Sequence, residues 1–235
     1  MDKSNLTMVA YEKIKQAIML NELKFGYCIS GNKISKMLNM SRTPVREAIQ
    51  LLARDGLIEI QNGVGFFVKQ LTITELEEIT EVRRILECAA LRSCIDDIPL
   101  SSLQKQTGHW GGLQAALCEN GKVSLEEVRK LDTQTHNLLT HSCNNAYLRE
   151  ILESIELRST RIQYLSVNPQ NVSGAIDQHV EILEAVMQRD TERALGLLEK
   201  HIEFSVSYLL KHPALLDSGN GSYLSDEYLS GIFQN

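Results

Sequence analysis

The chain has few residues that interrupt helices or cross-link loops. Its 235 residues include four prolines and five cysteines, and no two cysteines form a Cys-x-x-Cys pair. An odd number of cysteines without paired spacing argues against a disulfide framework and is typical of reduced thiols in the cytoplasm. No apolar run approaches the roughly 18 residues that a membrane-spanning helix needs, and no signal peptide is recognisable. We therefore expect a cytoplasmic protein without membrane contact.

Strand-like alternation is absent after Val68, and the sequence has no internal repeat or low-complexity tract. Apolar residues instead recur at helical spacing over most of residues 75–211, which predicts an all-α bundle of roughly six or seven helices. Thr74 is expected to cap the first of these helices. Residues 212–235 form a C-terminal tail, either disordered or packed as a short extra helix. The prolines beyond residue 70 fall near expected helix ends: Pro99, Pro169 and Pro213.

Acidic residues outnumber basic ones, and the formal net charge is −6. The imbalance is uneven, because residues 1–70 hold ten Lys and Arg against six Asp and Glu, whereas residues 71–235 hold fourteen against twenty-four. A basic N-terminal part suits contact with phosphates, and an acidic remainder does not. We expect a DNA-binding domain over residues 1–70, a linker over 71–74 and a helical effector-binding and dimerisation domain over 75–211.

The basic part contains an amphipathic helix, residues 41–57, with a distinctive polar face. Ser41 is a suitable N-cap, and Pro44 is tolerated in a first turn. One face is apolar: Val45, Ala48, Ile49 and Leu52. The other face is polar: Arg42, Thr43, Arg46 and Gln50. Because Arg can bond guanine O6 and N7 while Thr, Ser and a helix N-terminus hold phosphates, this helix predicts contact with a DNA major groove rather than an ordinary solvated face.

The flanking segments complete a winged helix-turn-helix. Residues 8–20 have helical periodicity, and a shorter helix marked by Ile34, Met37 and Leu38 precedes residue 41 at helix-turn-helix spacing. Residues 57–60 and 66–68 are expected as strands joined by an Asn-Gly turn. The predicted fold is therefore mainly α, with an N-terminal winged helix-turn-helix and a C-terminal all-α helical bundle.

Four polar residues of the bundle have the spacing of metal ligands. Asp132 and His136 are one turn apart and share a helix face. His179 and His201 each lie eleven residues from residue 190, where a helical hairpin is expected to turn, so both sit about 16 Å from the turn. Three imidazoles and one carboxylate suit Zn²⁺, Ni²⁺, Mn²⁺ or a similar divalent ion. The other histidines lack such partners and are interpreted as ordinary: His109, His141 and His212.

The sequence Ser-Arg-Thr-Pro-Val-Arg-Glu-Ala at residues 41–48, Gly-Leu-Ile at 56–58 and the glycine-bearing wing resemble the GntR family of bacterial transcription regulators. The resemblance implies that the first turn of the recognition helix meets bases and phosphates and that the wing tip enters the minor groove. The positions it implicates are Ser41, Arg42, Thr43, Arg46, Asn62 and Gly63. Some members place an arginine early in the second helix, where this chain has Asn32 followed by Lys33. Both are expected to contact DNA, but the operator preference of a relative does not carry over.

Residues 75–211 are similar to the FadR-type C-terminal domain (FCD) of one large branch of that family. The shared pattern is an Asp-x-x-x-His pair, a His and a second His 22 residues later, matched here by Asp132, His136, His179 and His201. The resemblance implies a metal at the floor of a cavity, with open positions for water or a small carboxylate effector. Arg83 resembles an arginine frequent in this branch and is expected to pair with the effector carboxylate. A surface salt bridge to a neighbouring glutamate is the alternative for Arg83.

Together these features predict a transcription regulator, not an enzyme, that responds to a small organic acid and binds a near-palindromic operator as a homodimer. The resemblance implies a repressor released by its effector, with activation left open. Two alternatives concern the metal. It is purely structural if four protein ligands close the site. A metal-dependent hydrolase would need a further acid or base near the metal-bound water, and no carboxylate has a suitable spacing.

Overall fold

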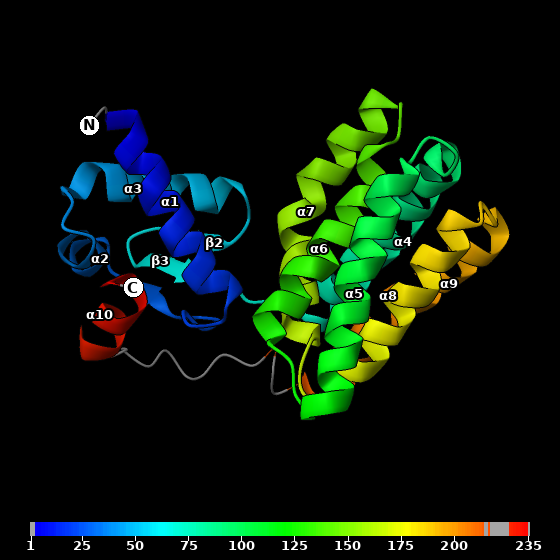
Figure 1. Cartoon of the computed structure of the whole chain (residues 1–235). Coiled ribbons are helices and arrows are strands. Elements are labelled where there is room, and N and C mark those ends of the chain that lie inside the picture. The colour runs from blue at the N-terminus through cyan, green and yellow to red at the C-terminus, as the bar shows by residue number, and fades with distance from the viewer. Residues whose placement is uncertain (1–2, 214–215, 217–225, 235) are drawn as a thin grey trace. The chain divides into compact units, whose positions relative to one another are not determined.

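The computed structural model describes residues 3–213, 216 and 226–234 and divides the chain into two compact units (Figure 1). The winged unit comprises residues 1–72 and 213–235, and the bundle comprises residues 73–212. The tail residues Gly219, Asn220, Gly221 and Tyr223 lie outside the described part of the chain. Each unit has its own apolar core, so each is considered separately.

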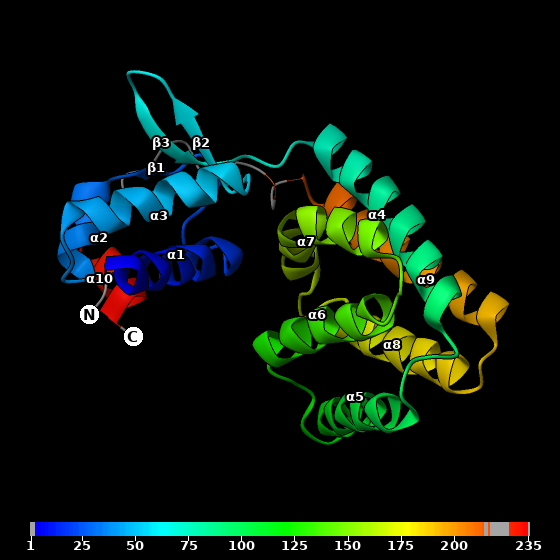
Figure 2. The ribbon, with the colours of Figure 1, turned by 90° about the horizontal axis from the view of Figure 1, so that it is seen from above.

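The body of the winged unit is built from helices and a small sheet: α1 (Lys3–Met19), β1 (Cys28–Ile29), α2 (Gly31–Met37), α3 (Arg42–Arg54), β2 (Ile58–Gln61) and β3 (Gly65–Val68). The sheet has the order β1-β3-β2, and both pairings are antiparallel. Strand β1, which the sequence did not predict, is only two residues long and pairs through Cys28 with Phe67. The β2–β3 hairpin projects beyond the helices (Figure 2).

Burial along α3 separates its two faces as the amphipathic pattern predicts. Val45, Ala48, Ile49 and Leu52 are fully buried. The polar residues of the opposite face are exposed: Arg42, Thr43, Arg46 and Gln50. Ser41 occupies the N-cap position, but its side chain makes no capping hydrogen bond, so the first-turn amides are not satisfied by it. The apolar face of α3 packs on α1, which fixes the polar face outward.

Six helices form the bundle: α4 (Ile73–Cys94), α5 (Leu100–Asn120), α6 (Leu125–His141), α7 (Ala146–Ser166), α8 (Val172–Met187) and α9 (Thr191–Lys211). Helix α6 contacts α4, α5, α7 and α8, and Figure 2 shows it between α5 and α7. Helix α4 begins at Ile73, so Thr74 lies in its first turn and does not cap it as expected. Within the described residues, no helix is long and apolar enough to cross a membrane.

Helices α8 and α9 form the hairpin predicted to turn near residue 190. Arg189 takes a left-handed conformation with φ of 57°, and Asp190 caps α9 by accepting a hydrogen bond from the amide of Arg193. The guanidinium of Arg189 donates to the carbonyls of Ile95 and Ile98, which ties the turn to the end of α4. The hairpin therefore holds His179 and His201 in a fixed register.

The described end of the tail is a helix, α10 (Asp226–Gln234), which belongs to the winged unit. Leu229 and Phe233 are buried, and α10 lies against α2 (Figure 1). Lys13 of α1 donates a hydrogen bond of 3.1 Å to the carbonyl of Phe233. Of the two expectations for the tail, a short extra helix is therefore correct for residues 226–234. This helix packs on the winged unit and does not extend the bundle.

Candidate metal centre and DNA-binding surface

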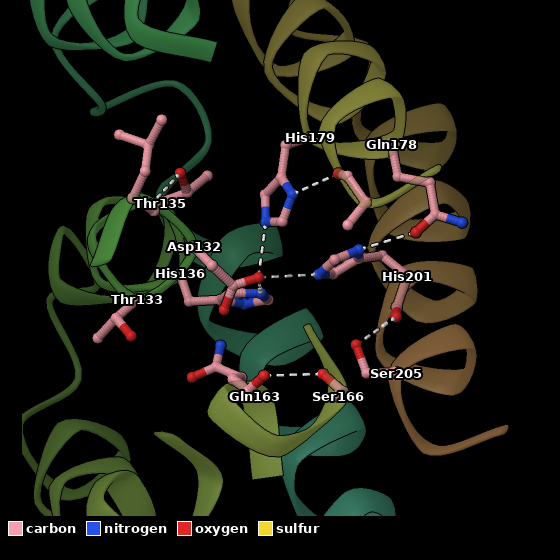
Figure 3. A network of polar contacts seen from close by, with 12 residues as sticks. Asp132, Thr133, Thr135, His136, Gln163, Ser166, Gln178, His179, His201 and Ser205 are labelled. Atoms are coloured by element: carbon pink, nitrogen blue, oxygen red, sulfur yellow. Dashed lines mark hydrogen bonds and ion pairs between the residues drawn. The ribbon is translucent and has the colours of Figure 1, made fainter. Parts of the chain in front are cut away.

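The four predicted metal ligands come together in the interior of the bundle (Figure 3). Helix α6 supplies Asp132 and His136, α8 supplies His179, and α9 supplies His201. All four side chains are buried, and one potential ligand atom from each lies within 4.8 Å of those from the others. We call these four residues the His₃Asp cluster.

The carboxylate of Asp132 is the common neighbour of the three imidazoles (Figure 3). Its Oδ1 atom lies 3.1 Å from Nε2 of His179, 3.6 Å from Nε2 of His201 and 4.0 Å from Nε2 of His136. Two ligand atoms bound to one ion at about 2.1 Å lie about 3.0–3.4 Å apart. The spacing within the cluster is therefore close to that of atoms sharing one metal ion.

The opposite nitrogen of each imidazole faces a hydrogen-bond acceptor. Nδ1 lies 2.7 Å from the Ala175 carbonyl in His179, 2.9 Å from Gln178 Oε1 in His201 and 2.6 Å from Glu87 Oε2 in His136. An acceptor at Nδ1 favours the tautomer that carries hydrogen there and leaves a lone pair on Nε2. Such partners are a regular feature of metal-binding histidines, because they orient the ring and raise its basicity.

The atoms that point into the cluster lack hydrogen-bond partners among the described residues. Oδ2 of Asp132 and Nε2 of His179 and His201 are buried and unsatisfied. A buried polar atom without a partner costs about 1–3 kcal/mol. A cation between these atoms removes that cost. The donor set therefore fits a divalent ion, and the cluster could bind one.

The electrostatics of the cluster keep its ligands in the forms that bind metals. Burial alone would raise the pKa of Asp132, but His179, His201 and His136 outweigh it and hold that pKa well below its usual value. Burial is also the main cause that lowers the pKa of His201 to about 3, because a charged imidazole is disfavoured away from water. Asp132 is therefore an anion and His201 a neutral donor at neutral pH.

Trp110, the only tryptophan of the chain, is part of the wall of the cluster. Its ring stacks on that of His179 with centroids 4.1 Å apart and an interplanar angle of 11°. Its indole N–H donates a 2.8 Å hydrogen bond to Thr135 Oγ1, and Gln106 donates to the same oxygen. These contacts fix the plane of the His179 ring and place a natural fluorophore beside a proposed ligand.

Arg83 lies on α4 beside the cluster, and it is buried rather than in the surface salt bridge considered from the sequence. Its Nε donates to Oε1 of Glu87, and its Nη2 lies 3.1 Å from both ring nitrogens of His136. Burial alone would raise the pKa of Glu87, but Arg83 and His136 outweigh it and lower that pKa to about 2. Arg83 and Glu87 are therefore a buried ion pair in contact with a predicted metal ligand.

A cavity of about 40 Å³ lies between α4, α6 and α7 and borders the cluster through His136. It has room for two or three water molecules, which is about the size of one carboxylate group. Its lining is mostly polar and includes Arg83, Glu87, Thr140, Ser159 and Gln163. The cavity therefore places a cationic guanidinium and a predicted metal ligand on one small space.

The structure also places the predicted DNA-contacting residues. Those of α3 and its N-terminus, the wing residues and Asn32 are exposed, and Lys33 is half-buried. Gly63, at the tip of the β2–β3 hairpin, has a φ of 77°, a conformation that side chains rarely adopt. Helix α3 and the wing therefore present polar atoms outward.

Three residues of the site were not predicted from the sequence: Glu87, Gln178 and Trp110. Glu87 is one turn from Arg83 on α4, and Gln178 directly precedes His179, so both had a sequence relationship to a predicted residue. That relationship is common on any helix and does not identify a hydrogen-bond partner. Trp110 had no such relationship, because only the packing of α5 on α8 brings it to His179.

The fold and the site define a winged-helix transcription regulator with a separate helical domain. Residues 6–68 match the family described as bacterial regulatory proteins, gntR family, and residues 78–204 match the FCD domain. The chain therefore belongs to the GntR family and carries an FCD domain, which confirms the resemblance, and it is a regulator that binds DNA, not an enzyme.

Related proteins support the same assignment. The chain is 29% identical to the HTH-type transcriptional regulator YdhC of Bacillus subtilis, covering 86% of this chain and 89% of that protein. It is 26% identical to the transcriptional repressor RspR of Escherichia coli, covering 76% and 77%. It is 27% identical to the gluconate operon transcriptional repressor of Bacillus subtilis, covering 83% and 80%.

Solved structures show the same fold. McbR/YncC of Escherichia coli superposes with a TM-score of 0.73 at 23% identity, over 88% of this chain and 98% of that one. A GntR regulator from Rhodococcus sp. RHA1 superposes with a TM-score of 0.72 at 24% identity, with the same coverage.

Proposed function

We propose that this protein is a cytoplasmic, ligand-responsive repressor that binds a near-palindromic operator as a homodimer and senses a small carboxylate through a metal ion. One observation carries the sensory part. Three buried imidazoles with acceptors at Nδ1 direct Nε2 toward the carboxylate of Asp132, beside a polar cavity that contains Arg83. The metal would be held by Asp132, His136, His179 and His201 and would act as a Lewis acid toward a bound carboxylate.

The charge of the site favours an anionic effector only when a metal is bound. Without the ion, Asp132 and Glu87 are both ionised, and their two negative charges exceed the single positive charge of Arg83. This excess negative charge repels an anion. A divalent ion changes the summed charge of Asp132, Glu87 and Arg83 from −1 to +1 and so gives a carboxylate a cationic partner. Two further glutamates, Glu153 and Glu156, also line the cavity. Arg83 would meet the effector through the outer part of its guanidinium, because its Nε is already bonded to Glu87.

On the DNA side, we propose that Arg42 and Arg46 read base edges in the major groove, while Ser41 and Thr43 hold phosphates. Asn32 and Lys33 would contact the backbone beside this groove, and Asn62 and Gly63 would enter the minor groove. Exposure of the polar face of α3 supports this assignment, because its apolar face is fully buried. The base sequence that the operator must have depends on the side chains of this chain and is not copied from the operator of a relative.

Repression is the regulatory direction that we propose. RspR of Escherichia coli and the gluconate operon protein of Bacillus subtilis are both repressors by name. Effector binding would alter the packing of α4, α6 and α7 around the cavity and so weaken operator binding. By linkage, operator DNA must then weaken effector binding by the same factor.

A purely structural metal is the second candidate for the cluster, favoured by one observation. Four protein donors already face one another in a buried space, and four donors are enough to close a tetrahedral site. In that case carboxylates would not bind beside the metal. The two candidates therefore differ in a measurable way.

The metal is tested by titrating EDTA-treated protein with Co²⁺ while following Trp110 fluorescence. Because Trp110 stacks on His179, a paramagnetic ion in the cluster should quench its emission at about one ion per chain. The double variant His179→Ala, His201→Ala should lose this quenching. His109→Ala, which changes an exposed histidine next to Trp110, is the matched control and should retain it. Retention of full metal content by the double variant would contradict this ligand set.

Effector binding is tested by calorimetry with lactate and gluconate, on protein with and without the metal. Heat of binding by the metal-loaded protein alone supports the sensory site. Binding by neither form, for these and other short hydroxy acids, would support the structural metal instead.

A further inference from the structure

Glu87 is placed to connect two parts of the site that lie on different helices. It belongs to α4, whereas the nearest metal ligand, His136, belongs to α6. One carboxylate oxygen accepts from Arg83 and the other lies 2.6 Å from Nδ1 of His136. All three side chains of this bridge are buried, which strengthens both contacts relative to the same contacts in bulk water.

We infer that Glu87 is the positioning residue of the metal centre: its carboxylate holds His136 in the tautomer that directs Nε2 into the cluster, and Arg83 in turn holds Glu87. The inference rests on the proposed metal-dependent function. His136 needs this support more than the other two imidazoles. Its Nε2 is the farthest of the three from Asp132 Oδ1, at 4.0 Å, and it also lies 3.1 Å from Arg83 Nη2, a donor that competes with a metal for the lone pair. His179 and His201 have acceptors from their own hairpin, at Ala175 and Gln178.

The bridge also connects the metal centre to the helix that enters the bundle from the winged unit. Only four residues, 69–72, separate the end of β3 at Val68 from the start of α4 at Ile73. Because Arg83 and Glu87 both lie on α4, an ion that fixes His136 also fixes this helix through Glu87. Metal occupancy would therefore bias the position of the element that leads directly to the wing.

Replacing Glu87 by glutamine preserves its size but not its two acceptors. The amide has one oxygen, so either Arg83 or the Nδ1–H of His136 meets an N–H₂ group instead. We expect Glu87→Gln to weaken Co²⁺ binding by roughly 10- to 100-fold, the usual effect of losing such a partner. Glu81→Gln, an exposed glutamate on the same helix, is the matched control and should bind as the wild type does.

A double-mutant comparison separates positioning from a general loss of structure. If Glu87 acts through His136, most of the effect of Glu87→Gln should disappear when His136 is already alanine. The affinity of His136→Ala for Co²⁺ should then be close to that of the double variant. An undiminished effect of Glu87→Gln in the His136→Ala protein would overturn the inference.

A second measurement does not depend on the metal. Long-range ¹H–¹⁵N spectra of the metal-free protein report the tautomer of each imidazole, and we expect His136 to carry hydrogen on Nδ1. Glu87→Gln should shift His136 away from that tautomer and leave His179 and His201 unchanged. An unchanged His136 spectrum would overturn the inference.

The Co²⁺ titrations separate the two proposals. If the wild type binds no Co²⁺, the proposed metal-dependent function fails together with this role. Equal Co²⁺ affinity of wild type and Glu87→Gln refutes the role of Glu87 alone.

Discussion

The side chains of the His₃Asp cluster can bind a metal ion only in particular protonation states. The neutral imidazole of His201 and the ionised carboxylate of Asp132 are both imposed by their surroundings, one by burial and the other by the three histidines. The same surroundings make the metal-free cluster a weak point of the bundle, because its inward atoms have no partners among the described residues. A bound ion should therefore raise stability as well as create the sensory site.

The metal-free protein should lose stability as the pH falls below neutrality. The pKa of His201 is about 3 in the folded chain, against 6.5 for an ordinary histidine, so between these values the unfolded chain binds a proton that the folded chain does not. The free energy of unfolding should therefore fall as the pH drops through this range, with a slope of up to about 1.4 kcal/mol per pH unit. Glu87, whose pKa is lowered from 4.5 to about 2, adds a loss of the same sign at lower pH.

Urea denaturation in EDTA at several pH values between 7.5 and 4.5 measures this slope. His201→Gln should have a shallower slope between pH 6.5 and 5. His212→Gln, which changes an exposed histidine at the end of α9, should leave the slope unchanged. Stability that rises as the pH falls would contradict the assignment of a neutral, buried His201.

Single helices carry most of the functional chemistry of this protein. Helix α6 contributes two of the four proposed ligands because an i, i+4 spacing places both on one face. Helical spacing likewise separates the proposed DNA-contacting residues of α3 from its core residues. The position of helix α10, in contrast, does not follow from spacing within the helix. Its sequence did not indicate a partner, and only contact with α2 shows that the chain returns to the winged unit after the bundle.

The arginines of α3 should determine operator affinity. Arg42→Ala and Arg46→Ala should each weaken specific binding by about 1–3 kcal/mol, or roughly 10- to 100-fold, because each removes contacts with a base or phosphate. Arg54→Ala, at the exposed C-terminal end of the same helix, is the control and should have little effect. Fluorescence anisotropy with a duplex enriched by selection from random DNA measures the difference. Wild-type affinity in both Arg42→Ala and Arg46→Ala would refute the assignment of α3.

The molecule as a whole should act as a symmetric dimer, because a two-fold operator is best read by two copies of one helix-turn-helix. We propose that α4 contributes to the contact between copies. Val82 and Ile85 lie on one face of this helix and are 41% and 54% exposed. Burial of such a face in a second copy would remove apolar surface from water.

Ile85→Glu should therefore shift the protein from dimer to monomer, as measured by sedimentation velocity. Ile151→Glu changes an isoleucine of similar exposure, 48%, on α7 and should leave the dimer intact. A monomeric wild type at micromolar concentration, or a dimer insensitive to Ile85→Glu, would contradict this placement.

Much of this protein could be derived from local sequence patterns. Helical periodicity predicted α3 and the six helices of the bundle, because an amphipathic helix repeats its apolar residues along one face. The register of His179 and His201 also followed from the sequence, since a hairpin that turns at Arg189 and Asp190 places residues equally far from the turn at one height. Local rules were less accurate at helix starts: Thr74 lies inside α4, and Ser41 takes the predicted N-cap position but makes no capping hydrogen bond.

The sequence by itself determined the two domain types, the exposed polar face of α3 and the candidate metal ligands, because each depends on spacing within one helix or one hairpin. The tertiary structure alone decided which groups surround those ligands. Glu87 meets His136 across two helices, Trp110 stacks on His179 from a third, and Arg83 is buried in an ion pair. These contacts join residues that are far apart along the chain, and packing between helices, which no local pattern encodes, brings them together.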